Sequence, residues 1–153
     1  MNKNKPYDIV LVANYLLALA NEKGVVLNTT KVQKLLYMAY GLLLAEKNRI
    51  ITDEQPKAWP YGPVFPKTRK KANYSKIQKT SDNEFSEIKE DFELTDCLNK
   101  IIDKFSGYTA TQLSNWSHDP QGPWQKTVDT DCFEWNTPIL NNYIKDYFKE
   151  FII

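Results

Sequence analysis

The chain has 153 residues, of which 42% are hydrophobic and 13% aromatic. This length and apolar content suffice for one sizeable hydrophobic core, but the chain is too short for two domains of ordinary size. Charged residues make up 25% and the formal net charge is +1, which excludes the imbalance of a disordered or nucleic-acid-coating chain. We therefore expect residues 1–153 to form a single domain.

The two halves of the chain carry opposite charge. Residues 1–80 hold 14 Lys and Arg against 5 Asp and Glu, whereas residues 81–153 hold 6 against 14. Two explanations are open: separate basic and acidic surfaces for partners, or halves that fold against each other and pair their charges. The pattern favours the second.

An apolar run from Ile9 to Ala20 opens the chain, and its spacing predicts one face of a helix that ends near Gly24. A signal peptide is the alternative, because lysines precede the run and small residues close it. Asn14 and Tyr15 inside the run favour the helix. No segment reaches the roughly 20 apolar residues that a transmembrane helix needs, so we expect a cytoplasmic protein.

A second helix is predicted to begin at a capping box, Thr30–Gln33, with its charged flanks, Lys34 included, in water. Gly41 within it indicates a closely packed neighbour, for which the first helix is the candidate. From Arg49 to Pro66 prolines recur too often for a regular helix or a central strand. We expect an ordered, proline-rich loop there, with a short β-hairpin within Arg49–Trp59.

The segment after this loop is basic and then polar. A short helix is predicted over Pro66–Lys71, with proline in its first turn, and residues 75–90 are expected to form a mobile surface loop. Another helix is predicted to begin around Asp91, because apolar residues then recur at intervals of three and four residues, and to end near Gly107.

The last third holds two further predicted helices. A capping box at Thr109–Gln112 opens a short helix that ends near His118, before a loop rich in proline and glycine. The final helix is predicted to start at Thr137, followed by proline. The fold class is therefore mostly α: a compact single domain of about five or six helices.

Few residues carry obvious chemistry. His118, with Asp119 beside it, could act as a general base, but adjacent residues rarely face each other and a structural role at a helix end is favoured. Cys97 and Cys132 are expected to be reduced thiols, and the sequence places no base near either that would activate it as a nucleophile. The sequence lacks short zinc-ligand pairs and phosphate-binding glycine spacing, so no cofactor or metal is expected.

A basic cluster could bind a phosphate backbone. The favoured interpretation is a solvent-exposed helix face whose positive charges pair with the acidic stretch that follows in the sequence. Nucleic acid is therefore not expected as a partner. The cluster comprises Lys67, Arg69, Lys70, Lys71, Lys76 and Lys79.

Three segments form an ordered pattern. They read KVQKLLYMAYG over residues 31–41, AWPYGPVFP over 58–66 and WSHDPQGPW over 116–124. Together they resemble the Panacea domain, a family of SocA-type antitoxins and phage-associated GepA-like proteins. Its members typically have a K-x-Q-K-L-L-Y helix, an A-W-x-Y-G-P-V turn and a later T-H…P-W element. Ser117 stands where threonine is common, and the resemblance covers about residues 8–148.

The resemblance implies a non-enzymatic antitoxin of a toxin–antitoxin pair, which neutralises a cognate toxin by protein–protein binding. The alternatives are an adaptor that delivers the toxin to a protease, a DNA-binding regulator and a hydrolase using His118. For Tyr37, Tyr40 and Trp59 two roles are open, partner contact or packing in the core or a structural turn, and their place in the signature favours packing. The candidate partner-binding residues are Tyr37, Trp59, Tyr61, Phe65, Arg69, Trp116, His118 and Trp124.

Overall fold

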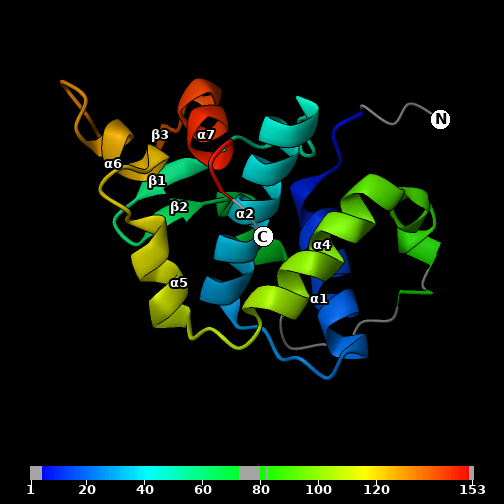
Figure 1. Cartoon of the computed structure of the whole chain (residues 1–153). Helices are drawn as coiled ribbons and strands as arrows, with labels where there is room; N and C mark the ends of the chain where they lie inside the picture. The colour runs from blue at the N-terminus through cyan, green and yellow to red at the C-terminus, as the bar shows by residue number, and fades with distance from the viewer. Residues whose placement is uncertain (1–4, 73–79, 82, 152–153) are drawn as a thin grey trace.

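A computed structural model describes residues 5–72, 80–81 and 83–151, and it confirms the mostly helical fold class (Figure 1). Two 3-10 turns, η1 and η2, and a small sheet accompany the helices. In chain order the elements are α1 Ile9–Glu22, α2 Thr29–Lys47, β1 Lys57–Trp59, β2 Gly62–Val64, α3 Pro66–Lys71, η1 Asn83–Phe85, η2 Ile88–Glu90, α4 Phe92–Phe105, α5 Ala110–Ser117, α6 Pro123–Val128, β3 Thr137–Pro138 and α7 Asn141–Phe148.

Helix α2 is the centre of the core. Residues 32–44 are all buried, because α1 and α4 pack on one side of the helix and the sheet, α5 and α7 on the other (Figure 1). A helix that is covered all round must also bury its polar side chains, so Gln33 and Lys34 need partners inside the protein. The prediction that Lys34 faces water is therefore wrong.

The helix ends are set by caps that the sequence revealed only in part. Asp8 caps α1, Thr109 and Gln112 form the predicted capping box of α5, and Gly24 follows α1 with φ of 72°. The predicted box at the start of α2 is wrong. Asn28 caps that helix by accepting from the Lys31 amide, which leaves the Gln33 side chain free for other bonds.

Glycine in α2 marks a close approach, as predicted, but the neighbour is α7 and not α1. A Cβ atom at Gly41 would lie 2.1 Å from Phe148 Cδ2, so only glycine admits this ring. Phe148 is itself fully buried, and it anchors the last helix onto the centre of the fold.

The sheet has the strand order β2-β1-β3, and both pairings are antiparallel. The expected hairpin exists but lies later than Arg49–Trp59, since β1 pairs with β2 across the turn at Pro60 and Tyr61. Thr137 and Pro138, the predicted start of the last helix, form β3 against β1. The Ile139 amide donates to Pro56 O, and α7 begins only after this pairing ends.

The expected mobile loop over 75–90 is replaced by ordered structure in its second half. Phe85 in η1 and Ile88 in η2 are fully buried, and the Phe85 ring lies 5.3 Å from that of Tyr15. Residues 75–79 and 82 of that prediction lie outside the described residues. A further helix, α6, occupies part of the predicted proline and glycine loop.

The oppositely charged halves pair at their seam, as the charge pattern favoured. Arg49, from the basic half, donates from both terminal nitrogens to Asp91, and its Nη1 lies 3.0 Å from Glu93 Oε1. Arg49 and Asp91 are both buried, so this pair is shielded from solvent screening. Within the described residues, no helix is long and apolar enough to cross a membrane.

Candidate functional site

The three sequence motifs meet at the turn that joins β1 to β2. Gln33 Oε1, from α2, accepts a 2.7 Å hydrogen bond from the Phe65 amide, and Gln33 Nε2 donates to Thr68 Oγ1. All three residues are buried. The glutamine side chain therefore provides an acceptor for the Phe65 amide, a backbone group at the end of β2 on the side where no described strand is paired.

Lys34, one residue later, holds the turn itself. Its side chain is only 2% exposed, and Nζ donates to the carbonyl oxygens of Tyr61 at 2.9 Å and Pro63 at 3.2 Å. Among the described residues, no carboxylate forms an ion pair with it. Burial lowers the pKa of the Lys34 ammonium to about 8, because the charged form loses hydration there.

Gly62 is the point where helices α2 and α5 reach the turn. Its φ is 110°, a conformation that side-chain-bearing residues rarely adopt. An added Cβ atom would lie 2.7 Å from both Lys34 Nζ and Ser117 Oγ, and 3.4 Å from His118 Cε1. The glycine is thus required by conformation and by space together.

The third motif ties α5 and α6 to β1. His118 Nδ1 lies 2.6 Å from Ser114 O, and the His118 ring meets the Trp124 ring edge-on with centroids 4.3 Å apart. Trp124 Nε1 donates to Trp59 O at 2.8 Å. Asp119 accepts from Tyr147 Oη rather than orienting the histidine, so the arrangement has the form of a structural clasp and not of a general base with its carboxylate.

These bonds support a small solvent-facing surface. Tyr61 is 70% exposed at the tip of the turn, and the Arg69 guanidinium lies 5.3 Å from the centroid of the half-buried Trp59 ring. His118 is half-buried, and its Nε2 lies 3.4 Å from Pro60 O in the same turn as Tyr61. We call Trp59, Tyr61, Arg69 and His118 the motif face.

Other predicted contact residues are enclosed by the fold. Tyr37 and Phe65 are buried in the core, and Trp124 is buried beneath the motif face. Trp116 is half-buried between the rings of Tyr37 and Phe148. Burial favours a packing role over partner contact for these four, as the sequence already favoured for Tyr37, because each ring holds elements together.

The motif face continues into a segment that the sequence analysis did not single out. The Trp135 ring stacks on Trp124 with centroids 6.3 Å apart, and Trp59 Nε1 donates to Asn136 Oδ1 at 2.8 Å. Trp135 is 51% exposed. An isolated tryptophan in a polar, aperiodic stretch was the one available signal. We call residues 129–136 the acidic loop, after Asp129, Asp131 and Glu134.

A groove of about 790 Å³ lies elsewhere, between the end of α2 and the start of α4. Its lining includes the Arg49–Asp91 pair and Cys97, whose thiol pKa is raised to about 12 by burial. A thiol with a raised pKa is a poor nucleophile at neutral pH. No group of three or more His, Cys, Asp or Glu suited to a metal ion occurs in the part of the chain that the structure describes.

Comparison with known proteins decides the family. The model of the antitoxin SocA-like family, Panacea domain, matches residues 32–125, well over half of the chain. The chain belongs to the Panacea family of SocA-like antitoxins. It is also 30% identical over 128 residues to the antitoxin SocA of Caulobacter vibrioides, covering 76% of this chain and 68% of that protein. No solved structure matches.

The Panacea match gives the site a physical meaning. Residues 32–125 contain Gln33, Lys34, the β1–β2 turn and the His118–Trp124 clasp, so the matched region coincides with the bonds that fix the motif face. The acidic loop at 129–136 follows the matched region. It packs on the Panacea scaffold through Trp124 and Trp59 without being part of the match.

Proposed function

We propose that this chain neutralises a cognate protein toxin by binding it directly, in a defined stoichiometry, through the motif face. The observation that carries the proposal is Tyr61, an exposed aromatic side chain on a turn whose carbonyl oxygens are held by buried Lys34. Aromatic and arginine side chains dominate the energy of protein interfaces. A surface ordered before binding loses little conformational entropy when the complex forms.

The other candidate functions have less support from the geometry. A hydrolase using His118 would need a base free to reach substrate, whereas Nδ1 is directed at Ser114 O and the ring packs on Trp124. On α3, Lys67 pairs with Asp53 and Arg69 lies over Trp59, which leaves the exposed Lys70 and Lys71 for phosphate contacts, a weak basis for a DNA-binding role.

We therefore propose a binding protein without catalytic activity, whose partner is the toxin and whose complex forms in the cytoplasm. Family membership supports the antitoxin role. Cys97 and Cys132 are both free thiols, which agrees with a reducing compartment.

The test takes a small reading frame that adjoins the gene as the candidate toxin and first establishes that its expression stops growth. Cells that express this frame are grown with and without the chain, and the two proteins are then co-purified and their mass in solution is measured. Rescue of growth together with a stable complex of fixed stoichiometry supports the proposal. Rescue that disappears in a protease-deficient host indicates an adaptor instead, and failure to rescue at all refutes the antitoxin role.

Two matched variants locate the surface. Tyr61→Ala removes an exposed ring from the motif face, and we expect the dissociation constant to rise by roughly 30-fold or more if Tyr61 is an interface hot spot. Phe92→Ala removes a similarly exposed ring, 80% accessible, from the start of α4 and should leave affinity unchanged. Equal effects of the two substitutions would contradict the assignment of the motif face.

A further inference from the structure

The acidic loop is held in one conformation although it contains no helix or strand. Cys132 and Asn136 adopt positive φ values of 61° and 80°, which reverse the chain within a few residues. The Asn136 amide donates to Ala58 O at 2.8 Å, and Thr137 Oγ1 donates to Glu134 O at 2.6 Å. The base of the loop is therefore fixed to β1 of the Panacea scaffold.

Aromatic packing orients the outer part of the loop. The Phe133 and Trp135 rings meet edge-on at 5.0 Å, and Trp135 in turn stacks on Trp124. Half of the Trp135 surface nevertheless stays in contact with solvent. A large ring held in place on one side and open on the other is the form of an interface anchor, because binding would cover the open side without ordering the side chain.

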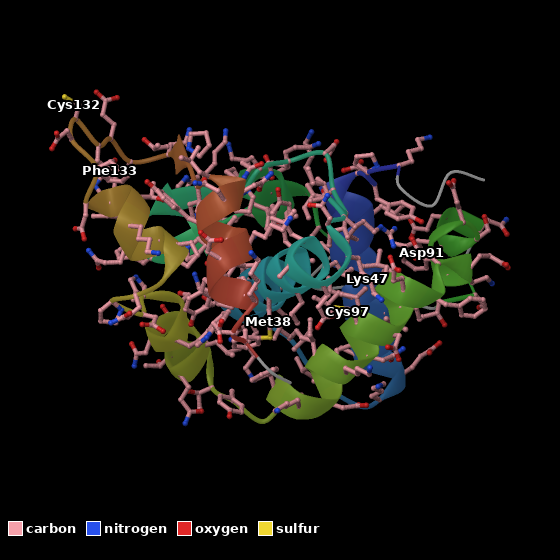
Figure 2. All side chains as sticks on the ribbon, turned by 45° about the horizontal axis from the view of Figure 1, so that its top comes forward. Met38, Lys47, Asp91, Cys97, Cys132 and Phe133 are labelled. Atoms are coloured by element: carbon pink, nitrogen blue, oxygen red, sulfur yellow. The ribbon has the colours of Figure 1, made fainter. Side chains whose placement is uncertain are left out.

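The charge of the loop is of a single sign. Asp129, Asp131 and Glu134 are all exposed, and residues 129–136 contain no lysine or arginine. Figure 2 shows Cys132 and Phe133 at a projection from the body of the protein, far from Lys47 and Asp91 at the groove beside α2 and α4. Carboxylates on a projection repel phosphate backbones and attract basic surfaces.

We infer that the acidic loop determines which toxin the chain binds, and that its occupant is a protein surface with an apolar recess for Trp135 edged by lysine or arginine. This inference rests on the proposed function. The Panacea motifs supply the fixed support, namely the rings of Trp59 and Trp124, whereas the recognition groups stand on a segment beyond the matched residues. Its charge then selects among partners by complementarity.

The test measures binding kinetics between the purified chain and the candidate toxin that the growth experiment identifies. Trp135→Ala should raise the dissociation rate by roughly 30-fold, as loss of a central anchor does, while Trp135→Phe recovers part of the affinity. The triple variant Asp129→Asn, Asp131→Asn and Glu134→Gln keeps the loop's shape and removes its charge. It should lower the association rate by about tenfold at low salt and flatten the salt dependence, with little change in dissociation.

The outcomes separate the inference from the proposed function. If Trp135→Ala and the triple variant bind as wild type while Tyr61→Ala fails, the loop inference is overturned and direct neutralisation stands. If only the charge variant is without effect, the basic character of the partner is refuted. If the wild-type chain neither rescues growth nor forms a complex, both proposals fall. Unchanged thermal unfolding of each variant, with Phe92→Ala as the surface control, excludes global misfolding as the cause.

Discussion

Replacing Lys34 with methionine tests the most unusual contact of the fold, a buried ammonium bound by the carbonyl oxygens of Tyr61 and Pro63. Its pKa of about 8 lies below the ordinary value of 10.5. Because the unfolded chain then binds more protons between these two values, the free energy of unfolding should rise with pH as folded Lys34 loses its proton. The shift corresponds to about 3 kcal/mol in total, of which about 2 kcal/mol falls between roughly pH 7.5 and 9.5.

Urea unfolding of the wild-type chain and of Lys34→Met across this pH range measures the effect. The sign is fixed by the depressed pKa: the stabilisation is complete above the unfolded pKa and is lost as the pH falls through about 8. The methionine variant should lack this rise, since it has no proton to lose. The exposed Lys70→Met substitution on α3 is the control and should follow the wild-type curve. A stability difference between wild type and Lys34→Met that stays constant with pH would refute the reasoning.

Three further predictions test other buried contacts of the fold. Gly41→Ala places a methyl group 2.1 Å from Phe148 Cδ2 and should lower the free energy of unfolding by about 1–3 kcal/mol in urea, whereas an unchanged midpoint would contradict the close approach. Arg49→Met leaves the buried Asp91 carboxylate without its main partner and should lower the free energy of unfolding by about 3–5 kcal/mol. Adding Asp91→Asn should recover part of that loss. Strictly additive effects of the two substitutions on the free energy of unfolding would argue against a coupled pair. Gln33→Leu should cost about 1–3 kcal/mol and speed hydrogen exchange at the Phe65 amide, and a protected amide would show that another acceptor replaces Gln33.

Local sequence signals predicted most of the helices, because their information lies within a few residues. Apolar spacing located α1 and α4, and the capping box at Thr109 located α5. The start of α7 was misplaced for the opposite reason. Thr137 followed by proline matches a helix cap, but pairing with Ala58, far away in the chain, makes the two residues a strand instead.

The candidate site was predictable in its segments and not in its roles. The motif pattern located segments that meet at the β1–β2 turn, yet periodicity put Lys34 in water, since its acceptors are carbonyl oxygens some 27 residues away. Residue type likewise does not reveal which aromatic candidates are exposed and which are buried. Tyr61 is exposed, whereas Phe65, four positions later, is fully buried. Trp135 was missed because its stacking on Trp124 is also a tertiary contact.

The two outer edges of the small sheet restrict how any partner can approach it. On β2, the outward carbonyl oxygens of Tyr61 and Pro63 are occupied by Lys34, and the Phe65 amide that follows is bound by Gln33. On β3, the Thr137 amide donates to Glu134 O, and Pro138 has no amide hydrogen. A foreign peptide finds few free backbone groups on these edges, so the proposed recognition depends on side chains rather than on strand addition.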